Sequence, residues 1–170
     1  PDNVAAGILS IGEYISVTLF GAILTAKGVT NRIIDPVKYI LADGEYLDSI
    51  ADVSLSKARF TDVPVDGSEF LIMPGFVAAN EEGQKVTLGR NGSDYSAAIL
   101  AACIDASCCE IWTDVDGVYN ADPNQVEGAV LLDKLTYQEA MELSYFGAKV
   151  LHPKTIGPIA QHHIPCLIRN

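Results

Sequence analysis

The sequence predicts an α/β fold, a three-layer αβα sandwich with helices on both faces of a sheet. Two observations lead to this expectation. Segments with strand character alternate with segments of helical spacing along the whole chain. Several of the strand segments are almost entirely apolar, as expected for strands that are buried on both faces. The 170 residues fit a single domain.

The chain opens with a long helical pattern. Asp and Asn near its start are typical of a helix N-terminus, and Gly28 is a stop signal. Gly12 is expected to end a short first helix in a tight turn, after which a longer helix runs from about Glu13 to Lys27.

The later elements follow from apolar periodicity and from turn residues. Residues 43–64 are polar and receive no assignment. Thr136 and Glu139, three positions apart, match the capping-box pattern. The expected elements are a strand at 29–35, a buried strand at 69–76, a hairpin at 76–89 with its turn at 81–84, a helix at 93–105, a short buried strand at 108–113, an extended piece at 131–135, helices at 136–143 and 153–163, and a strand at 164–170.

Composition excludes several classes of function. A net charge of -11 disfavours nucleic-acid binding, which needs clustered Lys and Arg. It also makes a bare anionic substrate awkward, so a nucleotide is expected to arrive with Mg²⁺. No apolar run reaches about 18 residues, and no membrane span is expected. The four cysteines lack paired spacing, which indicates reduced thiols and a cytoplasmic protein.

The stretch "LGRNGSDYSAA" at 88–98 places an arginine between two glycines, just before a helix. The glycines permit positive φ, and Ser93 can cap the helix. Arg90 offers a planar fork for a carboxylate or phosphate, and the N–H groups of a helix start attract anions. Ordinary turn chemistry, with Asp94 favouring the helix dipole, explains the same residues. Both interpretations stay open on spacing alone.

The stretch "WTDVDGVYNADP" at 112–123 follows a predicted strand, where α/β sheets commonly bind ligands. Asp114, Asp116 and Asp122 could hold a cation or ribose hydroxyls, or could satisfy backbone donors of a turn-rich loop. A calcium loop is excluded, because Val118 and Tyr119 occupy positions that need a ligand and a glycine.

Other candidates are isolated. Lys149, in "FGAKVLHP" at 146–153, either faces a phosphate or extends to solvent. Glu13 follows Gly12 at an expected helix start, where capping is the alternative. The three histidines lack partners at metal-ligand spacing, so no metal ligand is assigned. No Walker loop, dinucleotide fingerprint or nucleophile elbow occurs.

Together, "GE" at 12–13 and the stretches at 88–98, 112–123 and 146–153 resemble the aspartate kinases of the amino-acid kinase family. Within that family, the chain is most similar to the kinase module of the bifunctional aspartokinase–homoserine dehydrogenases, over essentially all 170 residues. The resemblance implies ATP-dependent phosphorylation of the side-chain carboxylate of aspartate, with Mg²⁺. This is the first step toward threonine, methionine and lysine. It also implies a homo-oligomer in the full-length enzyme.

The resemblance assigns roles to individual residues. Arg90 and Ser93 would bind substrate together with Glu13 and Phe76, and Asp94 would organise the transfer centre. The nucleotide would contact Thr113, Asp114, Tyr119 and Asp122, and its phosphates would meet Lys149. The substrate part is expected at roughly 1–90 and the nucleotide part at roughly 91–170. We expect the three loops at 88–98, 112–123 and 146–153 to converge at one end of the sheet.

The sequence also departs from the family. Ile11 and Asn124 stand where arginine is usual, and the family's opening strand with its "KFGGTS"-type loop has no counterpart. The residues are therefore expected to be the C-terminal larger part of a catalytic domain, with little or no kinase activity alone. The alternatives are a kinase of glutamate or acetylglutamate, and a non-catalytic nucleotide- or amino-acid-binding domain.

Overall fold

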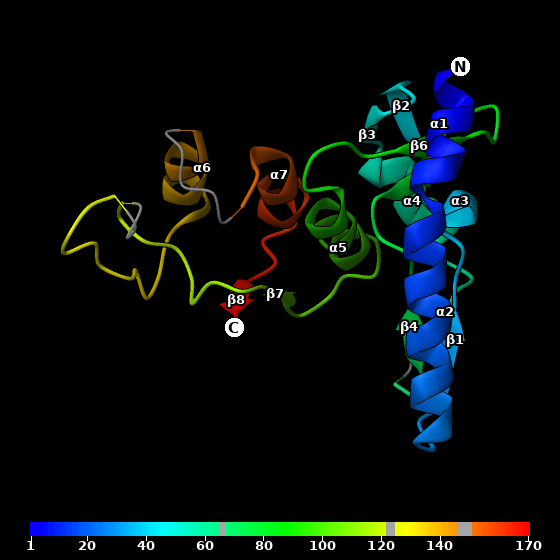
Figure 1. The fold of residues 1–170 in the computed structure, drawn as a ribbon, viewed down its shortest axis with the longest axis horizontal. Helices are drawn as coiled ribbons and strands as arrows, with labels where there is room; N and C mark the ends of the chain where they lie inside the picture. Colours follow the sequence, from blue (N-terminus) through cyan, green and yellow to red (C-terminus); the bar gives the residue numbers. More distant parts are fainter. Residues whose placement is uncertain (65–66, 122–124, 146–150) are drawn as a thin grey trace. The chain divides into compact units, whose positions relative to one another are not determined.

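The structure is a computed structural model that describes residues 1–64, 67–121, 125–145 and 151–170. The chain divides into two compact units, Pro1–Ser96 and Ala97–Asn170, and each is described by itself. Helices and strands alternate in both units, which confirms the expected α/β class (Figure 1).

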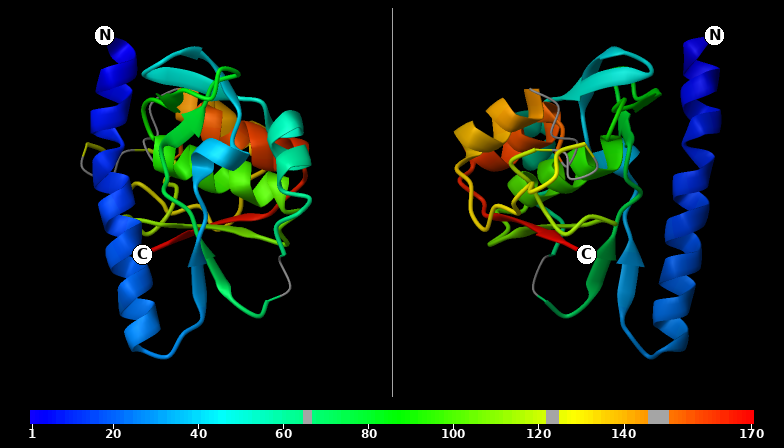
Figure 2. Two further views of the ribbon diagram at one scale, coloured as in Figure 1. Left: turned by 90° about the vertical axis from the view of Figure 1, so that its right-hand side faces the viewer. Right: turned by 60° about the vertical axis from the view of Figure 1, so that its left-hand side comes forward.

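The described strands of the first unit form three pairs. β1 and β4 run parallel, whereas β2 with β3 and β5 with β6 form antiparallel pairs. Helix α2 runs alongside β1 (Figure 2). Its elements are α1 (Asp2–Leu9), α2 (Ile11–Ala26), β1 (Asn31–Ile33), α3 (Pro36–Tyr39), β2 (Ala42–Glu45), β3 (Asp48–Ala51), α4 (Val53–Arg59), β4 (Phe70–Ile72), β5 (Val77–Ala79), β6 (Lys85–Thr87) and the start of α5 (Gly92–Cys103).

The break between α1 and α2 lies at Ser10, so the expected tight turn at Gly12 is wrong. Ser10 is itself right-handed helical, with φ -74° and ψ -15°, and the N–H of Tyr14 donates to its carbonyl at 3.3 Å. A glycine inside a helix costs only about 1 kcal/mol relative to alanine, and here the helix continues through it. The predicted stop is confirmed: Gly28 has φ 77°, and its N–H donates to the carbonyl of Thr25.

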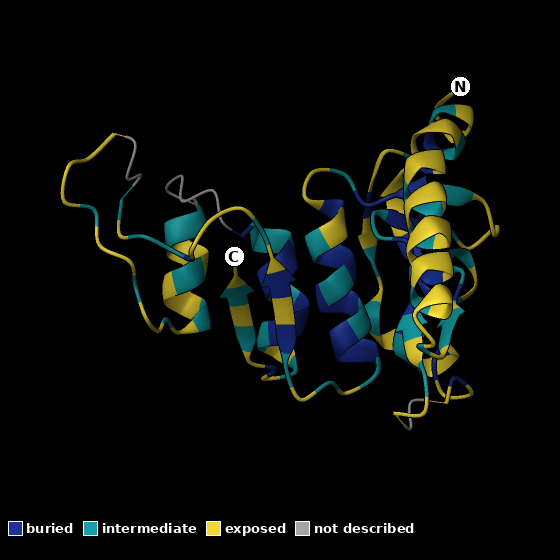
Figure 3. Cartoon of the chain, turned by 60° about the horizontal axis from the view of Figure 1, so that its bottom comes forward, coloured by how far each residue is buried: buried dark blue, intermediate teal, exposed yellow. Residues whose placement is uncertain are grey.

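One face of α1 and α2 packs against the first unit, and the other is apolar and exposed (Figure 3). The packed face carries small residues, and Ala6, Ser10 and Gly21 are buried. The exposed large apolar side chains are Val4, Ile8, Leu9, Ile11, Ile15, Leu19, Phe20 and Ile23. We call these eight residues the apolar outer face.

By length and composition alone, the helical stretch Asp2–Ala26, which comprises α1 and α2, could cross a membrane. The sequence expectation missed this because it counted uninterrupted apolar runs, and Glu13 interrupts this one. Core helices of globular proteins have the same composition, but most of their surface is covered. Here only 11% of the window is buried within the described residues.

The segment left unassigned, 43–64, contains regular structure. β2 and β3 form an antiparallel pair in which Ala42 faces Ala51, and α4 follows with Asp52 as its cap. The side chain of Asp52 accepts the N–H of Leu55 at 2.8 Å. The expected hairpin of β5 and β6 is confirmed. The strand expected at 69–76 is shorter, and Phe70 at its start is exposed rather than buried.

Among its described residues, the second unit contains the rest of α5 and one parallel strand pair. In that pair Cys109 faces Cys166 and Trp112 faces Arg169. The expectation of a buried strand at 108–113 is only half right. Buried and exposed residues alternate along β7 (Cys109–Trp112), and Trp112 is 69% exposed. The further elements are β7 (Cys109–Trp112), α6 (Tyr137–Tyr145), α7 (Pro153–Gln161) and β8 (Cys166–Arg169).

Helices α6 and α7 of the second unit begin as their sequences predict. The N–H of Thr136 donates to Oε2 of Glu139 at 2.8 Å, and the N–H of Glu139 donates to Oγ1 of Thr136 at 3.2 Å. This is a complete capping box. Pro153 occupies the first turn of α7. The extended piece at 131–135 is reduced to one bridge, between Leu131 and Tyr119.

Candidate functional site

The glycine-bounded loop before α5 has the backbone that its sequence predicts. Gly89 and Asn91 have φ values of 75° and 55°, and the N–H of Gly92 donates to the carbonyl of Gly89 at 3.1 Å. Asparagine tolerates this left-handed region better than most residues. The tight turn leaves Arg90 exposed directly before the helix start, where a side chain can reach a ligand.

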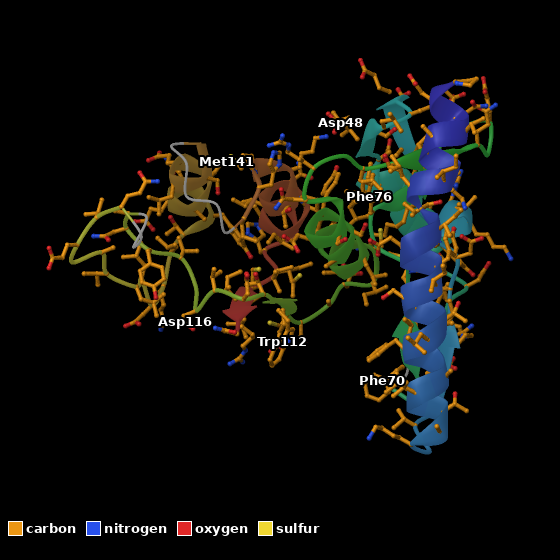
Figure 4. The ribbon with its side chains drawn as sticks, in the orientation of Figure 1. Asp48, Phe70, Phe76, Trp112, Asp116 and Met141 are labelled. Atoms are coloured by element: carbon orange, nitrogen blue, oxygen red, sulfur yellow. The ribbon has the colours of Figure 1, made fainter. Side chains whose placement is uncertain are left out.

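The loop that carries Phe76 packs onto the start of α5. A Cβ added to Gly75 would lie 3.1 Å from the Cα of Ser93, and a Cβ added to Gly92 would lie 2.6 Å from Cδ2 of Phe76. A side chain at Gly92 would force the Phe76 ring to move, and one at Gly75 would press against Ser93. The structure therefore brings Phe76 and Ser93, two predicted substrate-binding residues, to one place in the first unit. Figure 4 labels Phe76.

Asp94 lies in the first turn of α5 and is half-buried. Burial raises the pKa of its carboxyl above the ordinary value, and a side-chain hydrogen bond with Asn91 partly offsets that rise. A carboxylate in this environment favours a nearby cation, because opposite charge would offset the desolvation. That preference agrees with the predicted role of Asp94 in organising the transfer centre.

Glu13 lies in the first turn of α2 rather than after a glycine turn, because the helix begins at Ile11. Its neighbour Tyr14 contacts β6, since Nζ of Lys85 lies 4.3 Å from the centroid of the Tyr14 ring. In the described part of the chain no hydrogen bond or ion pair joins Glu13 to Phe76 or Arg90, so its place in the substrate site stays a prediction.

Two residues near this loop escaped the sequence reasoning. Asp48, at the start of β3, packs against the loop: a Cβ on Gly89 would lie 1.9 Å from its Oδ1 (Figure 4). Its hairpin is fixed to β6, because Thr87 donates its N–H to the carbonyl of Tyr46 and its hydroxyl to that of Leu47. Ser96, one turn into α5, is buried. In the sequence, only Gly75, Gly89 and Gly92 indicated that other parts of the chain approach this loop closely.

In the second unit, Thr113 and Asp114 directly follow β7. The N–H of Thr113 donates to the carbonyl of Arg169 at 2.8 Å, which extends the strand pair by one residue. Its hydroxyl donates to Oδ1 of Asp114 at 3.3 Å. Asp114 is exposed. Both predicted nucleotide ligands therefore stand at the carboxyl end of a parallel strand, where α/β proteins commonly bind ligands.

Tyr119 is held further along the same loop. It forms an isolated bridge with Leu131, and the N–H of Leu132 donates to the carbonyl of Val118 at 2.9 Å. Asp116 accepts a hydrogen bond from Nδ2 of Asn170 at 2.8 Å. These contacts fix the loop on both sides of Gly117, whose φ is 148°.

Two predicted site residues, Asp122 and Lys149, lie outside the described residues. Arg90 belongs to the first unit and Asp114 to the second. The expected convergence of the three loops therefore stays a prediction. Within the described residues, no three His, Cys, Asp or Glu side chains gather as a metal site. His152 caps α7, where its Nδ1 accepts the N–H of Lys154.

The matched family model is that of the amino acid kinase family, which covers residues 3–170. The chain belongs to this family. Its fold agrees with Escherichia coli aspartokinase III, solved with aspartate and ADP, at a TM-score of 0.92 and 34% identity. That likeness covers 99% of this chain and 38% of the other.

The curated relatives are longer proteins. The chain is 57% identical to a bifunctional aspartokinase/homoserine dehydrogenase of Buchnera aphidicola, over 100% of this chain and 21% of that protein. It is 53% identical to the bifunctional enzyme of Haemophilus influenzae, over 99% of this chain and 21% of that one. The chain thus spans about a fifth of the length of these relatives.

Proposed function

We propose that the protein carrying this chain phosphorylates the side-chain carboxylate of L-aspartate with ATP, giving 4-phospho-L-aspartate. This is the first step toward threonine, methionine and lysine. The observation that supports it most directly is the packed pair of loops in the first unit, where Gly75 lies against Ser93 and Phe76 against Gly92 at a helix N-terminus, with Arg90 exposed in the same loop. The relatives at 57% and 53% identity support the same activity. They also support a bifunctional aspartokinase–homoserine dehydrogenase as the whole protein.

In this reaction a carboxylate oxygen of aspartate attacks the γ-phosphorus, the bond to the β–γ bridging oxygen breaks, and ADP leaves. Such transfer depends mainly on positioning and on neutralisation of charge. Arg90 would hold a substrate carboxylate through two parallel hydrogen bonds. Asp94 would orient a cationic group, and the N–H groups at the start of α5 would favour an anion nearby.

The nucleotide would bind at the carboxyl end of β7. Thr113, Asp114 and Tyr119 would contact it, together with Asp122 and Lys149. A chain of net charge -11 repels a bare triphosphate, so we propose Mg-ATP as the bound form. No described cluster of three acidic or imidazole ligands would cage the ion, so the nucleotide phosphates would supply part of its coordination. The ion would neutralise phosphate charge.

The test is acyl-phosphate formation by the native polypeptide that carries these residues, with aspartate, glutamate and acetylglutamate offered separately. We expect turnover with aspartate only. Arg90→Lys keeps the charge but loses the fork, and should raise the KM for aspartate by about tenfold or more. Arg59→Lys, on the exposed end of α4, is the matched control and should leave that KM unchanged. Equal turnover with glutamate would contradict the proposal.

We also propose that the protein is cytoplasmic and forms a homo-oligomer. All four cysteines carry thiols, which supports a reducing compartment. Fractionation of cells and light scattering of the purified full-length protein test the two statements separately. Recovery in a membrane or secreted fraction would contradict the first, and the mass of a single chain would contradict the second.

A further inference from the structure

Ser96 ties the Phe76 loop to α5. Its side chain is 3% exposed, and its hydroxyl takes part in two hydrogen bonds. Oγ accepts the N–H of Phe76 at 2.8 Å and donates to the carbonyl of Gly92 at 2.8 Å. A serine inside a helix often makes the second bond alone. The first bond reaches a loop 20 residues earlier in the chain.

Phe76 has a backbone that needs such support. Its φ is 68°, a left-handed conformation that is unfavourable for a residue with a Cβ. Backbone in this state persists only where its surroundings fix it. Phe76 is fixed on both sides, because Ser96 accepts its N–H and its carbonyl accepts the N–H of Leu88 at 2.9 Å.

The tie also sets the distance between the Phe76 loop and the start of α5. Gly75 approaches Ser93 so closely that an added Cβ would lie 3.2 Å from its Oγ. The ring of Phe76 rests against Gly92. No other described hydrogen bond joins the N–H of Phe76 to α5, and these packing contacts have no directional preference of their own.

We propose that Ser96 is a positioning residue for the substrate site: its hydroxyl holds Phe76 in register with Ser93 and Arg90. The inference rests on the proposed function, in which these three residues bind the acidic amino acid. Ser96 itself is buried and acts through Phe76. Its loss therefore affects substrate binding more than nucleotide binding, because its described hydrogen bonds join it to Phe76 and Gly92 and to none of the predicted nucleotide residues.

The experiment compares Ser96→Ala with Ser144→Ala in the native polypeptide that carries this chain. Ser144, on α6, donates to the carbonyl of Ala140 at 2.7 Å, four residues back, as Ser96 does to Gly92. It is the matched control for the intrahelical bond. Ser96→Ala should raise the KM for aspartate by about tenfold, the scale of one lost buried hydrogen bond, with the KM for ATP within about twofold of wild type. Ser144→Ala should leave the KM for aspartate unchanged.

Two outcomes would overturn the inference: an aspartate KM within about twofold of wild type in Ser96→Ala, or equal increases in both KM values, which would indicate general loosening. If Ser96→Ala does not fold, Ser96→Cys replaces it, because its thiol is a weak hydrogen-bonding group. The same split of KM values is then expected. An unchanged aspartate KM in Ser96→Cys would overturn the inference.

Amide hydrogen exchange separates this inference from the proposed function. If the wild-type protein showed no aspartate-dependent turnover, the proposed function would be contradicted, but not the structural role of Ser96. In that case the tie is tested at the amide of Phe76, which should exchange faster in Ser96→Ala and at the wild-type rate in Ser144→Ala. An unchanged exchange rate in Ser96→Ala would show that Ser96 does not hold the loop.

Discussion

The hydroxyl of Tyr14 donates a hydrogen bond of 2.7 Å to Oδ1 of Asp35, and the same oxygen accepts the N–H of Val37 as the cap of α3. One carboxylate thus joins α2 to α3, close to the predicted substrate residue Glu13. Burial, followed by the hydrogen bond and the charge of Asp35, raises the pKa of Tyr14 well above its ordinary value.

Tyr14→Phe tests this link. The variant loses a hydrogen bond to a charged group and should lower the free energy of unfolding by about 1–2 kcal/mol at pH 7, measured by urea denaturation. Tyr46→Phe is the control, because the Tyr46 hydroxyl bonds the exposed side chain of Gln84. A loss in Tyr46→Phe as large as in Tyr14→Phe would contradict the assignment.

The same tyrosine predicts a loss of stability in alkali. A phenol with a raised pKa in the folded state binds its proton more tightly there than in the unfolded chain. The stabilisation is therefore complete below the unfolded pKa of about 10 and is lost as the pH rises through the folded pKa. Urea midpoints measured from pH 9 upward should fall more steeply for wild type than for Tyr14→Phe. If the urea midpoints of the two proteins fell in parallel with pH, the result would argue against a raised pKa of Tyr14.

Gly92→Ala should disturb the predicted substrate site. An added methyl group would lie 2.6 Å from the Phe76 ring and 3.2 Å from its Cα, so the loop must move. The expected cost is about 1–3 kcal/mol of stability, with a higher KM for aspartate. Gly7→Ala, in helix α1 with nothing within 4 Å, should instead stabilise the protein by about 0.5–1 kcal/mol. Equal effects of the two substitutions would contradict the packing described here.

Gly89→Ala separates backbone strain from crowding. Gly89 and Gly83 have nearly the same φ, 75° and 74°, so alanine at either should cost about 1–2 kcal/mol. Only at Gly89 would the methyl also displace Asp48, because space around Gly83 is open. Both variants should melt earlier, and only Gly89→Ala should raise the KM for aspartate. A similar KM change in Gly83→Ala would show that strain alone is responsible.

The capping box of α6 predicts an acid-sensitive helix start. Hydrogen bonds from the backbone and the hydroxyl of Thr136 lower the pKa of Glu139 below its usual 4.5. The stabilisation is thus present above about pH 4.5 and lost as the pH falls through the folded pKa. An NMR titration of Glu139 should show the lowered pKa, and Thr136→Ala should return it toward 4.5. Thr61→Ala, which removes a hydroxyl in the other unit, should not change it.

Elements with local signals could be predicted from the sequence. Gly28 ends α2, and Thr136 with Glu139 begins α6, because these signals act within one turn of helix. Gly12 misled because a glycine in a helix costs little when the rest of the pattern continues. The β2–β3 hairpin could not be predicted, because its sequence has no apolar alternation. Strand pairing and the hydrogen bonds from Thr87 to Tyr46 and Leu47 hold it instead.

The loop geometry of the candidate site could be predicted from the sequence, but its contacts could not. Two glycines before a helix predict the tight turn at 89–92, whereas the roles of Arg90, Ser93 and Asp94 come from the family resemblance and stay predictions. The tie between Ser96 and Phe76 could not be predicted, because it joins residues 20 positions apart and depends on a left-handed Phe76. No pattern of residue types indicates a left-handed phenylalanine.

The apolar outer face of α1 and α2 has a practical consequence for anyone who prepares these 170 residues by themselves. Eight large apolar side chains exposed along these two helices favour association with other apolar surfaces, including further copies of the same chain. Such a sample should be retained on a phenyl column, should brighten anilinonaphthalene dyes while fully folded, and should clear when a mild detergent is added. Without detergent, aggregation of the folded chain would resemble misfolding.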